Sequence, residues 1–204
     1  MSAAAARALV LLGAGGHARV VAELARAAGW TVVGFLDPHR AVGETVIGAP
    51  VLAGEVADWA GRAALIAAIG DNAIRRREHA RLVAADAATP ALVHPSAIVS
   101  PSAEIGPGAV VMAGAVVQAG ARIGAAAIIN TGACVDHDCD IGEAALIGPG
   151  AALCGGVHVG AATLVGAGAA VAPGVRIGEG ALIGVGASVR RDVPAGARML
   201  PWRV

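Results

Sequence analysis

The sequence predicts a chain of two parts, a small α/β unit followed by a parallel β-solenoid built from hexapeptide repeats. Up to about residue 90, short apolar runs typical of strands alternate with helical stretches. From Val93 to Val189 every sixth residue is Val, Ile or Leu, and a glycine commonly stands three residues after it. The change of pattern divides the chain into two domains, residues 1–90 and residues 91–204.

The N-terminal domain begins with a short apolar strand over residues 8–12, and a glycine turn then opens a helix that ends at Gly29. Residues 31–36 form a second strand, residues 63–69 a third, and a charged helix follows from about residue 74 to residue 85. Strands that alternate with helices predict a small parallel, Rossmann-like βαβ unit. The unit is too short for a complete dinucleotide fold, which needs two mononucleotide-binding halves.

The glycine turn "GAGGHA" after the first strand matches the pattern G-x-G-x-x-A, and Asp37 stands at the end of the second strand. Such a turn lets the backbone approach a phosphate at a helix N-terminus, while the acid can bind ribose hydroxyls or the edge of a nucleobase. A tight turn without any ligand is the alternative. Where the turn binds a ligand, a mononucleotide or a nucleotide sugar fits this short unit best.

The six-residue period of the C-terminal domain fits neither a helix, with 3.6 residues per turn, nor a long strand, with a period of two. It fits short strands joined by tight turns, which wind as a solenoid. The aliphatic residue fills the core, and a small residue two positions earlier lets neighbouring faces meet at a corner. Glycines such as Gly108 and Gly114 occupy the turn position that requires a positive φ.

The segment "CVDHDCDIGE", residues 134–143, concentrates acidic residues and a histidine, whereas residues 144–175 contain no formally charged residue. In the repeat, His137 and Asp138 fall on turn positions that point away from the core. Asp138 occupies the position where glycine dominates, which indicates that its carboxylate has a function. A neutral imidazole beside a carboxylate is suited to accept a proton during acyl transfer, and an exposed backbone N–H can stabilise the oxyanion.

Composition excludes several classes of protein. The fifteen basic and fifteen acidic residues balance, so nucleic acid is not an expected partner. Thirty glycines and ten prolines interrupt every apolar stretch, which argues against a membrane span. Three cysteines without C-x-x-C spacing predict neither a disulfide framework nor a zinc site. The N-terminus lacks the pattern of a signal peptide, so we expect a cytoplasmic protein.

Several motifs together resemble one family over nearly the whole chain. They are the glycine turn, Asp37, "AIGDNAIRRR" at residues 68–77, "HPSAIVSPSAEIG" from His94 and "VDHD" at residues 135–138. The chain resembles the NeuD/PglD-type sugar acetyltransferases of the hexapeptide-repeat acyltransferase superfamily. The resemblance implies a left-handed parallel β-helix, a homotrimer, and acetyl-CoA bound between neighbouring helices with no metal.

The resemblance also assigns roles to residues. His137 is the catalytic base and Asp138 its partner, and the backbone of Gly155, one coil later, faces the acetyl oxygen. The cofactor-binding residues that it implies are Gly155, Ala167 and Val185. The substrate-binding residues that it implies are Gly15, Gly16 and His17 at the diphosphate, Asp37 at the nucleoside, Gly70 and Asn72 in the pocket wall, and Asn130 near the sugar.

Other charged residues are predicted to be solvated, with Arg75 lying on a helix surface and His39 and His79 facing solvent. His158 is expected to stand alone, and Arg190 and Arg191 either meet CoA phosphates or form a solvated pair. Two positions depart from the family. Leu146 stands where many relatives have a histidine that contacts acetyl-CoA, and the tail at residues 199–204 lacks the common ending.

The resemblance implies acetyl-CoA-dependent N-acetylation of a UDP- or GDP-linked 4-amino-4,6-dideoxy sugar for surface glycans. O-acetylation of a sugar such as sialic acid is the nearest alternative, because the same histidine can activate a hydroxyl group. A metal enzyme of the γ-carbonic-anhydrase type is disfavoured, since His94, His137 and His158 do not have that family's spacing. A non-catalytic regulatory or scaffold protein is a third class.

Overall fold

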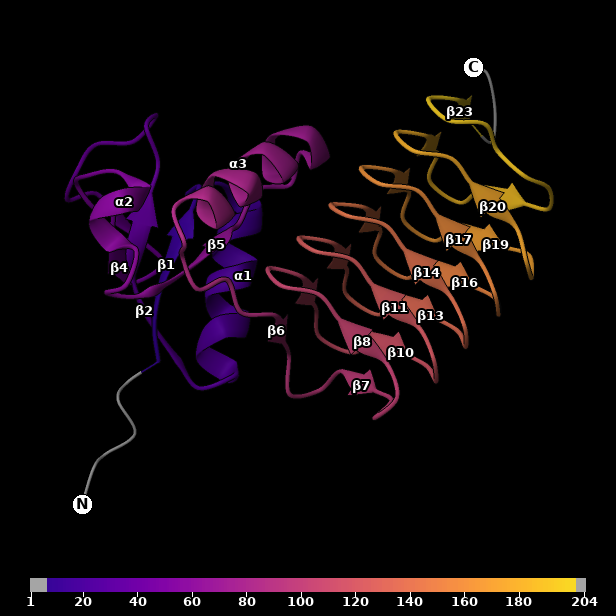
Figure 1. Cartoon of the computed structure of the whole chain (residues 1–204), viewed down its shortest axis with the longest axis horizontal. Coiled ribbons are helices and arrows are strands. Elements are labelled where there is room, and N and C mark those ends of the chain that lie inside the picture. The colour runs from indigo at the N-terminus through magenta and orange to yellow at the C-terminus, as the bar shows by residue number, and fades with distance from the viewer. Residues whose placement is uncertain (1–6, 201–204) are drawn as a thin grey trace. The chain divides into compact units, whose positions relative to one another are not determined.

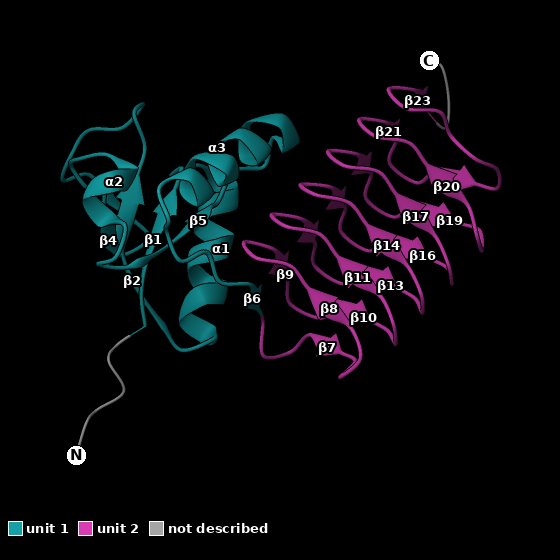
Figure 2. Cartoon of the chain, in the orientation of Figure 1, with its two compact units in different colours: residues 1–93 teal, residues 94–204 magenta. Residues whose placement is uncertain are grey.

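The computed structural model describes residues 7–200, so the final part of the tail motif lies outside the described residues. The chain divides into two compact units, residues 1–93 and residues 94–204 (Figure 2). Each unit is built from a local sequence pattern of its own, strands alternating with helices in the first and hexapeptide repeats in the second.

Unit 1 is an α/β unit whose central sheet has three parallel strands in the order β2-β1-β5 (Figure 1). The predicted strands and helices are all present, and the structure adds a short antiparallel pair and a one-turn helix between the second and third predicted strands. The elements are β1 (Arg7–Leu12), α1 (Gly16–Ala27), β2 (Trp30–Leu36), β3 (Thr45–Val46), β4 (Ala49–Pro50), α2 (Val56–Trp59), β5 (Ala64–Ala67), α3 (Asn72–Ala84) and β6 (Leu92–Val93).

Helix α1 forms because Ala18, Val21, Ala22 and Ala25 recur at helical spacing, and all four are fully buried. Helix α3 begins two residues earlier than predicted, because the side chain of Asp71 caps it by accepting a hydrogen bond from the N–H of Ile74 at 2.8 Å.

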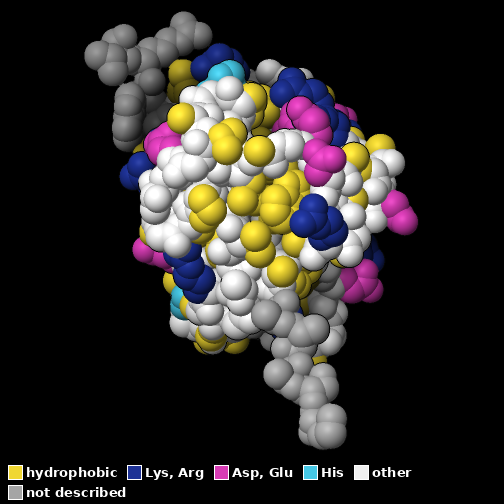
Figure 3. Space-filling view, turned by 90° about the vertical axis from the view of Figure 1, so that its left-hand side faces the viewer, with side chains coloured by type: hydrophobic (Ala, Val, Ile, Leu, Met, Phe, Trp, Pro, Cys, Tyr) yellow, Lys and Arg dark blue, Asp and Glu magenta, His cyan; other side chains and the backbone are white. Residues whose placement is uncertain are grey.

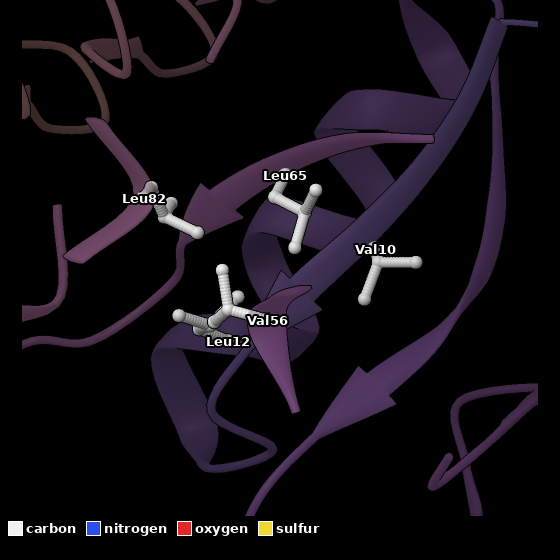
Figure 4. Close-up of a cluster of buried hydrophobic side chains, with 5 residues drawn as sticks. All are labelled: Val10, Leu12, Val56, Leu65 and Leu82. Carbon is white, nitrogen blue, oxygen red and sulfur yellow. The ribbon is translucent and has the colours of Figure 1, made fainter. Parts of the chain in front are cut away.

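A cluster of buried aliphatic side chains holds the sheet to its helices (Figure 4). Val10 and Leu12 come from β1, Leu65 from β5, Val56 from α2 and Leu82 from α3. Val10, Leu65 and Leu82 are completely buried. Burying a side chain of this size stabilises the fold by roughly 1.5–3 kcal/mol. The cluster therefore fixes the sheet and, with it, the turns that leave the carboxyl ends of the strands.

Unit 2 is the predicted solenoid, a left-handed parallel β-helix with a coil of three short strands. Residues 18 apart pair in register, as Val117 does with Val135. The first sheet consists of β7 (Ile98–Val99), β10 (Val116–Val117), β13 (Cys134–Val135), β16 (Ala152–Leu153), β19 (Ala170–Val171) and β22 (Ser188–Val189). The second consists of β8 (Glu104–Ile105), β11 (Arg122–Ile123), β14 (Asp140–Ile141), β17 (His158–Val159) and β20 (Arg176–Ile177). The third contains β9 (Val110–Val111), β12 (Ile128–Ile129), β15 (Leu146–Ile147), β18 (Leu164–Val165), β21 (Leu182–Ile183) and β23 (Arg198–Met199).

The second residue of each strand points into the core, as predicted, and Val135 for example is fully buried while Cys134 is exposed. Glycine directly after this residue lets successive coils approach closely. A Cβ atom added at Gly142 would lie only 2.5 Å from the backbone N of Ala161. The aliphatic period and the small residues therefore set the cross-section of the coil and the spacing between coils.

Three turns connect the strands of each coil, and we call them the first, second and third corners after the sheet whose strand precedes them. Most corners have a glycine with positive φ at their third position, as predicted. At four corners a residue other than glycine adopts the positive φ, namely Ala126, Asp138, Ala144 and Ala162, with φ between 52° and 57°. The left-handed backbone of Asp138 is thus confirmed, but alanine also occupies this position. The case for a function of Asp138 must therefore come from the contacts of its carboxylate.

Neither a membrane helix nor a metal cluster is found in the part of the chain that the structure describes. No helix within residues 7–200 is long and apolar enough to cross a membrane. The same residues contain no group of three or more His, Cys, Asp or Glu side chains that could hold a metal ion. On the face seen in Figure 3, basic and acidic side chains are interspersed around a hydrophobic centre. That face has no continuous basic stripe.

Candidate functional site

The first corner that follows β13 presents three polar side chains to solvent, those of Asp136, His137 and Asp138. Backbone hydrogen bonds to neighbouring coils hold this corner. The N–H of Asp138 donates to the carbonyl oxygen of Ala119 at 2.9 Å, and the carbonyl oxygen of His137 accepts from Gly156 at 2.9 Å. The carboxylate of Asp136 accepts the N–H of His137 at 2.8 Å. The corner is thus a rigid platform for exposed side chains.

The imidazole of His137 pairs with the carboxylate of Asp138. The Nδ1 atom of His137 lies 2.9 Å from Oδ2 of Asp138, and both side chains are mostly exposed. A neutral ring that donates its Nδ1–H to a carboxylate has its lone pair on Nε2, which then can accept a proton. The hydrogen bond to Asp138, and next the negative charge of Asp136, raise the pKa of His137 above its ordinary value. The pair is therefore arranged so that Nε2 of His137 can accept a proton.

Gly155 lies on the first corner of the following coil, directly against the ring of His137. A Cβ atom built on Gly155 would lie 2.4 Å from both Cε1 and Nε2 of His137. Among residues 7–200, no hydrogen bond engages the N–H of Gly155. A free backbone donor beside Nε2 is suited to stabilise a developing oxyanion. In the preceding coil the absence of a side chain at Gly120 leaves room for the Asp138 carboxylate, since a Cβ there would lie 2.7 Å from Oδ1 of Asp138.

The other predicted residues of the solenoid lie on a different edge. Asn130, Ala167 and Val185 belong to third corners, whereas His137 and Gly155 belong to first corners. The side-chain oxygen of Asn130 accepts the N–H of Thr131 at 2.8 Å. The first sheet separates these two edges within one chain. The structure thus brings Gly155 to His137, but it does not bring Asn130, Ala167 or Val185 there.

Unit 1 contains a cleft of about 930 Å³ at the carboxyl ends of its parallel strands. This edge of an α/β sheet is where ligands commonly bind. Of the predicted substrate-binding residues of unit 1, Gly15, Gly16, His17, Asp37 and Gly70 line the cleft. Helix α1 opens at the cleft without a side-chain cap, so its first N–H groups can meet an anion.

Asp37 has a structural role in this cleft. Its Oδ2 accepts the N–H of Ala14 at 2.8 Å, and its Oδ1 accepts the N–H of His39 at 2.8 Å. The carboxylate therefore ties the glycine turn to the end of β2. Each carboxylate oxygen has a second acceptor site, so these bonds leave room for a ligand hydroxyl or N–H group.

Arg75 contradicts the prediction of a solvated surface charge, because it is completely buried. Its guanidinium donates to the carbonyl oxygens of Ile69 at 2.9 Å and Gly70 at 3.0 Å, and to the side-chain oxygen of Asn72 at 2.8 Å. Burial lowers the pKa of Arg75 to about 10, so the side chain is still charged near neutral pH. Asn72 does not line the cleft itself and instead serves as an acceptor for Arg75.

His17 is predicted at the diphosphate, and the structure places it in the cleft as a neutral group. Burial, and then the positive charge of Arg75, lower the pKa of His17 to about 4. It therefore offers no positive charge to a phosphate near neutral pH. Sequence reasoning missed the cationic side chains that also line the cleft, which are Arg40, Arg77 and Arg81. Arg77 and Arg81 are four residues apart, so the helix predicted at residues 74–85 already places them on one face.

Two further histidines differ from prediction. His79 is buried in α3, with only 3% of its surface exposed, and is not a solvated residue. His158 does not stand alone, because its Nδ1 lies 3.4 Å from Oδ2 of Asp140 on the neighbouring strand. His39 is exposed and borders the cleft. Arg190 and Arg191 are exposed at the corner that follows β22, where Nε of Arg190 donates to Ser188 Oγ at 3.4 Å.

Comparison with known proteins places these features in a family. Residues 8–82 match the PglD N-terminal domain. The whole chain is similar to a histidine-to-asparagine variant of perosamine N-acetyltransferase from Caulobacter crescentus, solved in complex with CoA and GDP-perosamine. The two are 41% identical, with a TM-score of 0.90, and the match covers 94% of this chain and 92% of the other. The chain belongs to the NeuD/PglD-type sugar acetyltransferases.

A second solved relative of this sugar acetyltransferase is the acetyltransferase domain of PglB from Neisseria gonorrhoeae, in complex with acetyl coenzyme A. It is 40% identical, with a TM-score of 0.90, and 95% of each chain is covered. The comparison with curated proteins gave no match. The predicted family is thus confirmed, and so is the fold class of a small α/β unit followed by a left-handed β-helix.

Proposed function

We propose that this acetyltransferase transfers the acetyl group of acetyl-CoA to the 4-amino group of a GDP- or UDP-linked 4-amino-4,6-dideoxy sugar, with His137 as general base. The observation that carries the proposal is the His137–Asp138 pair, whose Nε2 is adjacent to the free N–H of Gly155. The protein is an acetyl-CoA-dependent acetyltransferase, like its relatives solved with CoA or acetyl-CoA.

The cleft of unit 1 supports a nucleotide-linked acceptor. It joins an uncapped helix N-terminus, which suits phosphate, to the carboxylate of Asp37, which suits a ribose or a nucleobase. A relative that shares 41% of its residues was solved with GDP-perosamine and CoA. We therefore assign nucleotide-sugar binding to the domain of residues 1–90 and acetyl transfer to that of residues 91–204.

In the proposed reaction His137 accepts a proton at Nε2 from the attacking amine as the new C–N bond forms at the thioester carbonyl. Asp138 holds the ring in the required tautomer and stabilises the imidazolium. Gly155 donates its N–H to the oxyanion. As the C–S bond breaks, the imidazolium returns the proton to the departing thiolate, so the base is regenerated and the products are the amide and CoA.

We also propose that the active form is a homotrimer in the cytoplasm. Within one chain the first sheet separates the edge with His137 from the edge with Ala167 and Val185. A neighbouring copy that presents its Ala167 and Val185 edge beside the His137 edge would complete the acetyl-CoA site. The outward residues Leu146, Leu164 and Leu182 form a partly exposed aliphatic row on the third sheet, which suits such packing. A fully active monomer by light scattering would refute this proposal.

The test is an assay of CoA release with GDP-linked and UDP-linked 4-amino sugars, with free sialic acid measured in parallel. We expect turnover with one of the nucleotide amino sugars and an N-acetyl product by mass spectrometry. Turnover with sialic acid alone would identify an O-acetyltransferase instead. If acetyl-CoA neither reacts nor protects the protein against thermal unfolding, a regulatory or scaffold protein would be indicated. We further propose that the N-acetylated product is used in the synthesis of surface glycans such as the O-antigen.

A further inference from the structure

The buried guanidinium of Arg75 lies behind the turn that joins β5 to α3. This turn borders the cleft through Ala68, Ile69 and Gly70. Arg75 donates to the carbonyl oxygens of two of these residues, Ile69 and Gly70, although it does not itself line the cleft. A planar guanidinium holds several acceptors in one fixed arrangement. Arg75 thereby sets the conformation of one wall of the cleft from behind.

The adjoining wall of the cleft is the glycine turn, and it packs directly against the β5–α3 turn. A Cβ atom built on Gly13 would lie 3.1 Å from Cγ1 of Ile69 and 3.3 Å from the carbonyl oxygen of Ala68. A Cβ built on Gly70 would lie 3.9 Å from Cβ of His17. A shift of the β5–α3 turn would therefore displace the glycine turn and the start of α1.

We propose that Arg75 is a positioning residue for nucleotide-sugar binding, which fixes the β5–α3 turn against the glycine turn so that the cleft keeps its binding geometry. The inference rests on the proposed function of this cleft. Arg75 acts through the backbone of Ile69 and Gly70 and through His17, whose ring it helps to keep uncharged. Its loss should therefore weaken binding of the nucleotide sugar without affecting the chemistry at His137.

The test compares Arg75→Met and Arg75→Lys with the control Arg19→Met, since Arg19 is exposed on α1 and does not border the cleft. For Arg75→Met we expect the KM for the nucleotide sugar to rise by at least about tenfold, because a displaced turn would lose at least one hydrogen bond to the charged nucleotide sugar. The kcat and the KM for acetyl-CoA should be unchanged. Arg75→Lys should give an intermediate KM, because an ammonium keeps the charge but lacks the planar fork.

A second readout separates positioning from general destabilisation. Removal of the Arg75 charge should raise the pKa of His17, followed by NMR of the imidazole, from its value of about 4, while burial keeps it below the ordinary value. Arg75→Lys should leave this pKa low. If circular dichroism shows that Arg75→Met does not fold, the KM of Arg75→Lys for the nucleotide sugar tests the inference instead.

The inference is overturned if the folded Arg75 variants bind the nucleotide sugar as wild type does, or if both substrates lose affinity equally. Failure of the proposed function would look different, because the wild-type protein would then bind neither GDP-linked nor UDP-linked amino sugars by calorimetry.

Discussion

Replacement of Gly155 by alanine should disable the active site through one methyl group. Gly155 has no positive φ, so alanine is compatible with its backbone. The added Cβ would lie 2.4 Å from Cε1 and Nε2 of His137, whereas ordinary contacts begin at 3.4 Å. The imidazole must therefore move by about 1 Å, and a displacement of that size in a reacting group can cost about 10²-fold in rate. The same movement strains the hydrogen bond to Asp138.

The assay is CoA release with both substrates saturating, supported by circular dichroism to verify folding. The control is Gly180→Ala, at the third position of a second corner, where φ is 65° and no atom lies within 4 Å of the added Cβ. Ala126, Ala144 and Ala162 already occupy the equivalent corner position of other coils. We expect Gly155→Ala to lose about 10²-fold in kcat and Gly180→Ala to retain activity. Wild-type turnover by a folded Gly155→Ala protein would refute the placement of His137 as the base.

Two more substitutions test the two domains separately. Asp37→Ala should weaken nucleotide-sugar binding by about 10- to 100-fold, the value of hydrogen bonds to a charged group, and leave acetyl-CoA affinity unchanged by calorimetry. Equal losses for both ligands would contradict the assignment of Asp37. Asp138→Asn removes the main cause of the raised pKa of His137. Because the base is active when neutral, the rising limb of the pH–rate profile should move to lower pH, with a smaller loss of rate than on removal of the imidazole. A limb at the wild-type position would show that Asp138 does not tune His137.

The repeat made the solenoid predictable, because each coil is built from the same hexapeptide pattern of core and turn residues. The inward position of Val135 and the left-handed backbone of Asp138 follow from the six-residue period alone. The pair of Asp140 and His158 was missed, although the 18-residue coil places these residues side by side. Pairing residues one coil apart would have found it.

Unit 1 was predictable in its elements but not in its buried charges. The carboxyl ends of parallel strands meet at one edge, so the glycine turn and Asp37 could be assigned to one site. Arg75 and His79 sit in a charged helical run that gives no amphipathic signal. Their burial depends on how α3 packs on the sheet, which a single sequence does not encode locally.

The central claim is that His137 is the general base, and the turnover of His137→Asn tests it most directly. Asparagine fits the corner and keeps hydrogen-bonding capacity, but it cannot accept a proton near neutral pH. We expect both substrates to bind as in wild type while kcat falls by about 10²–10⁴-fold, the usual effect of losing a general base. The pH–rate profile should also lose its imidazole limb. Near-normal turnover by His137→Asn with that limb intact would contradict the account and place the base elsewhere.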